Sequence, residues 1–158
     1  MSDVDRDFEV MIAQLFESKV QHERVLEAEQ VGLLRDLWDT ACELGLPWIG
    51  ISEDAGGSGG SIQDLVTLLS ATGQFAVPLP LLENHLAAWL VTAAGGQVDQ
   101  GKLWVVAPAT PRDSLLISNS RVSGTVHDVA WGGTAHAVVA LIENSDGAQV
   151  VQLDPTQA

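Results

Sequence analysis

Apolar residues in the first part of the chain recur at spacings of three and four, which is the period of an amphipathic α-helix. These stripes predict a helix that starts near residue 4, with Phe8, Met11, Ile12, Leu15 and Phe16 in its apolar stripe. They also predict a wide apolar helix over residues 30–45, and helices over Ile62–Thr72 and Leu81–Ala94. Residues 18–30 are more polar and leave two interpretations open, a loop or a second, exposed helix. The first part of the chain is therefore expected to be all helical.

Glycine and proline separate these predicted helices. Gly45 suits the left-handed position that follows the end of the second helix. Leu46–Ile51 holds a Pro and a Gly and is expected to be an extended connector, and the glycine-rich residues 52–60 are expected to form a loop. Ser61 and Asp64 match the spacing of a capping box at the start of the next helix.

The pattern of the sequence changes after Lys102, where short runs rich in β-branched residues replace the apolar stripes typical of helices. The predicted strands are Leu103–Ala107, Leu115–Ser118, Ala135–Ile142 and Ala148–Leu153, with a turn or strand start at Arg121–Gly124 and a hairpin turn at Asn144–Gly147. The predicted fold class is α+β: an all-α helical domain over residues 1–100, followed by a partial antiparallel β-barrel-like domain over residues 101–158.

The net charge of the chain excludes some classes of binding partner. The chain of 158 residues has a net charge of −14 and an isoelectric point near 4.3, and its seven Lys and Arg residues are scattered. Such an acidic chain repels nucleic acids and anionic membrane surfaces, so neither is an expected partner. The N-terminal segment lacks an apolar signal region and no apolar run is long enough to span a bilayer, which predicts a cytoplasmic protein.

Several kinds of chemistry lack their sequence signatures. The single cysteine, Cys42, cannot form an intrachain disulfide and is expected to be a small core residue, with a reactive thiol as the alternative. The four histidines have no metal-ligand spacing, so no metal site is expected. The glycine-rich loop lacks the Gly-Lys-Ser/Thr of a nucleotide-binding loop, which favours a tight connection between helices over a phosphate site.

Trp131 lies between Asp128 and Thr134 in the sequence DVAWGGT, where neighbouring glycines would let a flat ligand approach. Two interpretations stay open for it, a ligand-facing ring and a core residue. The other four tryptophans, Trp38, Trp48, Trp89 and Trp104, are expected to fill the core or an interface.

Three passages carry a family resemblance. Residues 37–60, LWDTACELGLPWIGISEDAGGSGG, resemble the hallmark of the acyl-CoA dehydrogenase N-terminal domain, with Ser52 where Pro is usual. Residues 73–82 resemble the proline-containing passage before the family's next helix, and residues 122–136 more loosely resemble a passage of its β-domain. The resemblance covers nearly the whole chain.

This resemblance implies a flavoprotein that oxidises the α,β-bond of an acyl-CoA thioester, with FAD between the β-domain and a C-terminal helical bundle. It further implies a homo- or hetero-oligomer. The residues that stand where the family has its flavin contacts are Thr110, Val129, Ala130 and Trp131. Asn84 and His85, polar residues on an apolar helix, are the expected substrate contacts by this resemblance, with a surface or capping role as the alternative.

The chain departs from the family in three ways. It lacks the C-terminal bundle, and no residue matches the glutamate base, so no catalytic residue is assigned. The usual flavin motif is not recognisable near Ala107–Pro111, and Val129-Ala130-Trp131 replaces the usual Trp-Ile-Thr. This divergent pattern resembles dehydrogenases of steroid or aromatic catabolism in actinobacteria.

Three readings follow. The chain is a segment of a dehydrogenase that needs a bundle to complete it, a non-catalytic subunit that dimerises with a full-length dehydrogenase, or an unrelated helical domain. Because FAD and coenzyme A are polyanions and cations are few, any phosphate would have to bind to backbone N–H groups, helix N-termini or a partner chain.

Overall fold

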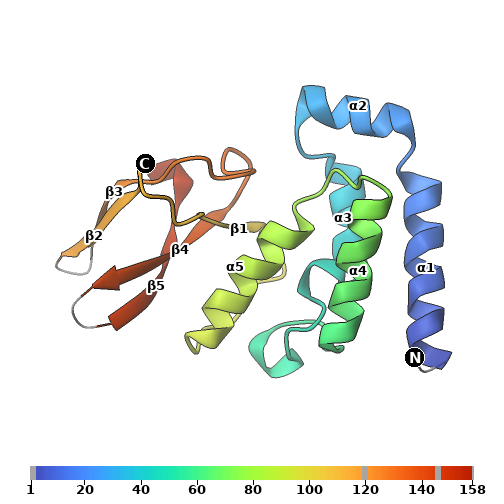
Figure 1. Cartoon of the computed structure of the whole chain (residues 1–158), viewed down its shortest axis with the longest axis horizontal. Helices are drawn as coiled ribbons and strands as arrows, with labels where there is room; N and C mark the ends of the chain where they lie inside the picture. The colour runs from blue at the N-terminus through green and yellow to red at the C-terminus, as the bar shows by residue number, and fades with distance from the viewer. Residues whose placement is uncertain (1–2, 119–120, 145–146, 158) are drawn as a thin grey trace. The chain divides into compact units, whose positions relative to one another are not determined.

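The computed structural model describes residues 3–118, 121–144 and 147–157. It contains two compact units, Met1–Leu82 and Glu83–Ala158, whose elements are labelled in Figure 1. The first unit is helical, and the second combines a helix with β-strands. The predicted α+β class is confirmed. The compact units divide between Leu82 and Glu83. The domain boundary near residue 100 stays a prediction.

The first unit consists of four helices and two short 3-10 turns. They are α1 (Asp3–Lys19), α2 (His22–Val31), α3 (Arg35–Glu43), η1 (Leu46–Trp48), η2 (Glu53–Ala55) and α4 (Ile62–Gln74). Helices α1 and α4 pack against each other, and α2 runs across one end of this group (Figure 1). The core includes Ile12 and Phe16 from α1, Leu37 and Trp38 from α3, and Leu65 and Leu68 from α4.

Two expectations about the first helices are resolved. The polar residues 18–30 form the exposed-helix alternative, since they contain most of α2. The expected stripe on α1 included Met11, but that side chain is 45% exposed whereas Ile12 is buried. Met11 therefore lies on the outer side of α1.

The predicted helix over residues 30–45 is two elements. Helix α2 ends at Val31 because Gly32 takes a left-handed φ of 77° and its N–H bonds to the Ala28 carbonyl. Helix α3 begins only at Arg35. Leu33 and Leu34 are nevertheless buried in the connection, so the apolar pattern marked the core correctly and the helix start wrongly.

The connector after α3 was expected to be extended, which is wrong. Gly45 has the expected left-handed φ of 70°, and Leu46–Trp48 then form the 3-10 turn η1 with Pro47 in its first turn. Proline fixes φ near the value that a helical turn needs. Ser61 caps α4 as expected: its hydroxyl accepts from the Asp64 N–H, and Asp64 Oδ2 accepts from the Ser61 N–H at 2.7 Å.

Most of helix α5 (Leu81–Ala93) belongs to the second unit, together with all strands. Strands β1 (Trp104–Val106), β4 (Ala137–Asn144) and β5 (Gly147–Leu153) form one sheet, and β2 (Ser114–Ser118) and β3 (Arg121–Thr125) form another; η3 (Pro155–Gln157) follows. The β2–β3 and β4–β5 pairs are antiparallel as expected, whereas β1 and β4 run parallel. The centre of the expected turn at Asn144–Gly147 lies outside the described residues.

Tryptophan burial follows the expectation in part. Trp38, Trp48 and Trp104 are buried, and Trp131 is partly buried. Trp89 on α5 is 56% exposed, so it does not fill the core of this chain. Leu86, one turn before it, is also exposed. This outer face of α5 is apolar although the chain leaves it open to solvent.

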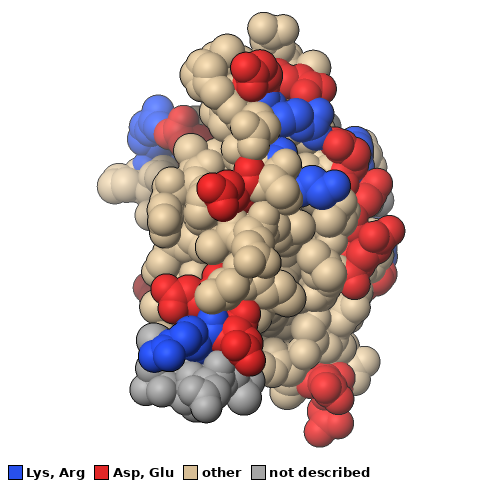
Figure 2. Space-filling model, turned by 90° about the vertical axis from the view of Figure 1, so that its right-hand side faces the viewer, with Lys and Arg blue, Asp and Glu red and all other residues tan. Residues whose placement is uncertain are grey.

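Acidic side chains dominate the surface of the first unit. Figure 2 shows one face, on which Asp and Glu outnumber Lys and Arg and the few basic groups do not merge into a patch. Arg24 is engaged with two acids, since its guanidinium contacts Glu27 and Asp36, each at 2.6 Å. Arg24 is therefore already neutralised by carboxylates of the chain itself.

Candidate functional site

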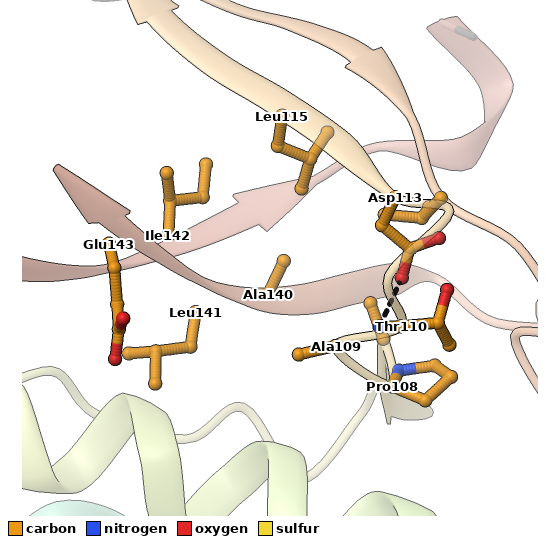
Figure 3. A pocket seen from close by; sticks show the side chains of 11 residues that line it. Pro108, Ala109, Thr110, Asp113, Leu115, Ala140, Leu141, Ile142 and Glu143 are labelled. Atoms are coloured by element: carbon orange, nitrogen blue, oxygen red, sulfur yellow. Dashed lines mark hydrogen bonds between the residues drawn. The ribbon is translucent and has the colours of Figure 1, made fainter.

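A half-open pocket lies within the second unit. Its volume is about 390 Å³. The strands β2 and β4 and the loop after β1 supply most of its walls (Figure 3). The lining residues are Ala107, Pro108, Ala109, Thr110, Asp113, Leu115, Val126, Ala140, Leu141, Ile142 and Glu143. We call this cavity the β-pocket.

The middle of the β-pocket is apolar and its ends are acidic. In Figure 3 the side chains of Leu115, Ala140 and Ile142 lie between the carboxylates of Asp113 and Glu143. The eleven lining residues include no Lys, Arg or His. Such a wall suits an uncharged, largely apolar group, because apolar burial is favourable there and any anion would meet two carboxylates.

Thr110, one of the expected flavin contacts, lines the β-pocket. Its N–H donates to Asp113 Oδ2 at 2.8 Å. Its hydroxyl oxygen is buried and has no hydrogen-bond partner among the described residues. The hydroxyl lies close enough to lower the pKa of Asp113 slightly, but the two groups do not reach the geometry of a hydrogen bond. A buried hydroxyl without a partner is costly, so it is a natural contact for a ligand or a water molecule.

Asp113 links the two ends of the β2–β3 hairpin. No sequence motif pointed to this residue. Besides the Thr110 N–H, it accepts the His127 N–H at 2.8 Å, and the His127 ring Nδ1 lies 3.1 Å from Oδ1. The Thr110 N–H, followed by the His127 ring and N–H, holds the pKa of Asp113 at about 2. The carboxylate is thus ionised at neutral pH and fixed in place. In the sequence, the only sign of this arrangement is that Asp113 follows Thr110 by three residues, a spacing at which an Asp side chain can bond to the backbone of a turn.

The other expected flavin contacts lie in a strained turn after β3. Asp128 and Trp131 have left-handed φ values of 55° and 61°, which bulky side chains rarely adopt. The Trp131 carbonyl accepts hydrogen bonds from the Thr134 and Ala135 N–H groups at 3.0 and 3.1 Å, and Arg112 pairs with Asp128. These contacts hold the turn in its strained backbone conformation. Val129, Ala130 and Trp131 do not line the β-pocket, so the four expected contacts fall into two groups.

Asn84 and His85, the expected substrate contacts, are both buried. Asn84 is 1% exposed, and its Oδ1 accepts from the Trp104 N–H at 3.0 Å. This bond fastens α5 to the first residue of β1. Burial lowers the pKa of His85, and its Nδ1 has no hydrogen-bond partner in the described part of the chain. A substrate role for either residue stays a prediction.

The glycine-rich loop is a closely packed connection. The N–H groups in the middle of the loop bond within the chain: Ser58 donates to the Trp48 carbonyl, and Gly57 and Gly59 donate to the carbonyls of Ser52 and Ile51. A Cβ added at Gly57 would lie 2.2 Å from the Ile51 carbonyl oxygen. The glycines therefore serve close backbone packing, in keeping with the expected tight loop.

The residues of the β-pocket do not fit a whole FAD molecule. A volume of about 390 Å³ is at the lower end for a drug-sized ligand, and a dinucleotide is larger than that. The apolar wall and the buried Thr110 hydroxyl could face a flat ring, but Asp113 and Glu143 oppose a pyrophosphate. No chemical step is therefore assigned to FAD in this pocket.

Within the described residues, the chain has neither a cluster of metal-ligating side chains nor a helix that could span a membrane. No three His, Cys, Asp or Glu side chains there are grouped closely enough to hold a metal ion. None of the described helices combines the length and the apolar character needed to cross a membrane.

Comparison with known proteins places the chain. A family model described as "Acyl-CoA dehydrogenase, N-terminal domain" matches residues 2–108. The chain is 28% identical over 136 residues to "Acyl-CoA dehydrogenase IpdE2" of Mycobacterium tuberculosis, which covers 85% of this chain and 42% of that protein. The chain therefore spans less than half the length of this curated relative.

Solved structures share the fold. The Tcur3481-Tcur3483 steroid ACAD, solved as a variant, superposes with a TM-score of 0.80 at 22% identity, over 96% of this chain and 48% of that chain. The ChsE4-ChsE5 complex from Mycobacterium tuberculosis gives 0.77 at 21% identity, over 98% and 48%. These likenesses show the fold, and the match to the N-terminal domain over residues 2–108 shows that the chain belongs to the acyl-CoA dehydrogenase family.

Proposed function

We propose that this chain is a segment of an acyl-CoA dehydrogenase that takes part in FAD-dependent α,β-dehydrogenation of an acyl-CoA thioester once a C-terminal helical bundle completes it. The observation that carries the proposal is the partial match, which covers 85% of this chain but 42% of its dehydrogenase relative. When bound, FAD supplies the hydride acceptor of such a reaction. The base and the second wall of the flavin site are assigned to the completing bundle.

Within this proposal, the chain contributes a fixed wall. Asp113 holds the loop that carries Thr110 and the segment that leads to Trp131 through three contacts of 3.1 Å or less. The strained turn at Val129–Trp131 and the buried hydroxyl of Thr110 are the groups proposed to contact the flavin. Strained backbone conformations persist only where the surrounding structure holds them, and they are common at ligand sites.

The alternative is a non-catalytic subunit that dimerises with a full-length dehydrogenase. It is favoured by the exposed apolar face of α5, since exposed apolar surface drives association. Among the structural relatives, one is the ChsE4-ChsE5 complex and another is a steroid ACAD. These relatives support an oligomer and a setting in lipid or steroid catabolism for this chain.

The two readings differ in what turnover requires. The chain would be purified alone and together with any dehydrogenase polypeptide encoded beside it, and each sample assayed with a panel of acyl-CoA thioesters and an artificial electron acceptor. If the chain completes the enzyme, activity needs both polypeptides. If it is a non-catalytic partner, the second polypeptide turns over without it. Failure of the two to associate, with no activity in any sample, would sink both readings.

The α5 face provides a control for that experiment. Trp89→Glu places a charge on the exposed apolar face and is expected to abolish co-purification. Val31→Glu makes the same change at a residue that is 62% exposed at the end of α2, and it is expected to leave association intact. Equal effects of the two variants would contradict a role for α5 in assembly.

A further inference from the structure

A histidine holds the start of strand β1 against the start of strand β4. The His136 N–H donates to the Leu103 carbonyl at 2.8 Å, and the His136 ring Nδ1 accepts from the Leu103 N–H at 3.0 Å. Leu103 directly precedes β1, and His136 directly precedes β4. Both main-chain polar groups of Leu103 are therefore bonded to one residue, and one of the two bonds depends on an ionisable ring.

The bond to the ring exists only while the ring is neutral. A neutral imidazole has one N–H and one nitrogen that accepts, whereas a protonated imidazole has two N–H groups and no acceptor. Because Nδ1 of His136 accepts the Leu103 N–H, the proton of the neutral ring is on Nε2. Protonation would place a second N–H opposite that of Leu103, so this bond would be lost. The bond from the His136 N–H to the Leu103 carbonyl does not involve the ring.

The two partners differ in their access to solvent. The His136 residue is exposed, so protons from solvent reach its ring. Leu103 is 1% exposed. An N–H that loses its acceptor in such a poorly solvated place is costly, and the local backbone has to move for water to replace the ring. A change of charge at the surface is thus coupled to the backbone at the start of β1.

The nearest charges oppose this bond. The carboxylate of Asp99 and the His136 ring interact electrostatically, and a negative charge there favours the protonated ring. Asp99 also pairs with Lys102 at 3.1 Å, and this cation weakens its effect. The Leu103 N–H favours the neutral ring while Asp99 favours the charged ring, so both forms are accessible to the folded chain.

Further titratable groups on the elements around His136 include Glu83 and His85 on α5, Asp128 in the preceding turn and Asp154 after β5. Asp128 pairs with Arg112, and Asp154 Oδ1 accepts from the N–H and the hydroxyl of Thr156 at 2.9 and 2.7 Å. Burial lowers the pKa of His85, which keeps that ring neutral. Glu83 lies in the first turn of α5, where the helix dipole favours its charge.

We propose that His136 is a pH-dependent latch: its neutral ring fastens the start of β1, and protonation of the ring releases the Leu103 N–H. This inference is independent of the proposed function. The far end of β1 is held separately, since the Ala107 N–H donates to the Val139 carbonyl at 2.8 Å. Acid is therefore expected to loosen the first residue of the strand and to leave the end that leads into the β-pocket in place.

NMR of the ring nitrogens tests the ground state of the latch. A long-range proton–nitrogen spectrum of the purified chain at about pH 8 shows which ring nitrogen carries the proton. His136 is expected to carry it on Nε2. His127 is the internal contrast, because its Nδ1 lies 3.1 Å from Asp113 Oδ1 and is expected to carry the proton instead. A neutral His136 ring with its proton on Nδ1 overturns the proposal.

Amide hydrogen exchange measures the release. Between about pH 8 and pH 5, the range in which histidines usually titrate, the protection factor of the Leu103 amide is expected to fall about threefold to tenfold, as for the loss of one hydrogen bond. The Ala107 amide is expected to keep its protection. A loss at Leu103 alone supports the latch. Unchanged protection at Leu103, or an equal loss at Ala107, overturns it.

Three variants assign the response to the ring. His136→Asn offers an acceptor that does not titrate, so the Leu103 protection should no longer depend on pH. His22→Asn removes an exposed histidine of α2, in the other unit, and should leave the response as it was. Asp99→Asn removes the charge that favours the protonated ring, so the midpoint of the response should move to lower pH. A response that persists in His136→Asn, or is lost in His22→Asn, refutes the latch, and an unmoved midpoint in Asp99→Asn contradicts the role of that carboxylate.

Discussion

Replacing Gly57 by Ala tests whether the glycine-rich loop exists for packing. Gly57 is buried, and its N–H donates to the Ser52 carbonyl at 2.9 Å. An added Cβ would lie 2.2 Å from the Ile51 carbonyl oxygen and 2.5 Å from its carbonyl carbon. Because these atoms belong to the backbone, no side-chain rotation can relieve the overlap. The loop must shift, together with the hydrogen bonds that close it.

Overpacking of a well-filled interior typically costs 1–3 kcal/mol, and a clash with fixed backbone belongs at the upper end, about 3 kcal/mol. Gly73→Ala is the matched control, since nothing lies within 4 Å of its added Cβ. Gly73 is in the last turn of α4, where Ala is a better helix former by about 0.5 kcal/mol. The same chemical change is thus expected to have opposite signs at the two sites.

Thermal unfolding followed by circular dichroism distinguishes them. In a unit of this size, 1 kcal/mol shifts the midpoint by about 4–8 °C. Gly57→Ala is expected to lower Tm by roughly 12–24 °C, and Gly73→Ala to raise it by roughly 2–4 °C. If Gly57→Ala unfolds within about 3 °C of the parent chain, the loop is looser than argued and its glycines need another explanation.

Three further outcomes are expected. Ser61→Ala removes the capping box of α4 and should cost about 1 kcal/mol in urea unfolding, whereas the exposed mid-helix Ser70→Ala should stay near zero. Because the pKa of Asp113 falls from 3.8 to about 2 on folding, its stabilisation is present above about pH 4 and is lost as the pH falls towards 2. Asp113→Asn should remove this acid-dependent part of the unfolding free energy, and an unchanged pH profile would contradict it. Burial raises the pKa of Cys42 to about 11, so its reaction with Ellman's reagent at mild alkaline pH should be at least 100-fold slower in the folded chain than in urea.

The sequence allowed much of the fold to be predicted, because periodicity and capping are local. The paired residues Ser61 and Asp64 fix the start of α4 by contacts three residues apart, and Gly45 takes the left-handed conformation that its position indicated. The errors fell where tertiary packing outweighed the local pattern. Leu33 and Leu34 carry the helical pattern of burial but lie in a connection, and Leu46–Trp48 form a turn rather than an extended piece.

The site was less predictable than the fold. Thr110 and Trp131 could be singled out by resemblance, yet their separation into a pocket wall and a strained turn depends on the strand pairing of β2 with β3. Asp113 escaped notice because His127, its partner across the open end of that hairpin, is brought near only by folding. A surface or capping role was the alternative for Asn84, but its side chain is buried and bonds to the Trp104 N–H of β1.

The sequence by itself determined the α+β class, the acidic surface and the family, since each depends on residue types and their order. Only the tertiary structure decided that N–H groups of the glycine-rich loop donate to carbonyls of the chain itself. It also decided that Asp113 and Glu143 lie on either side of the apolar centre of the β-pocket. The physical reason is that hydrogen-bond partners and charges act over a few ångströms of space. The chain brings those groups together from residues that are 30 positions apart in sequence.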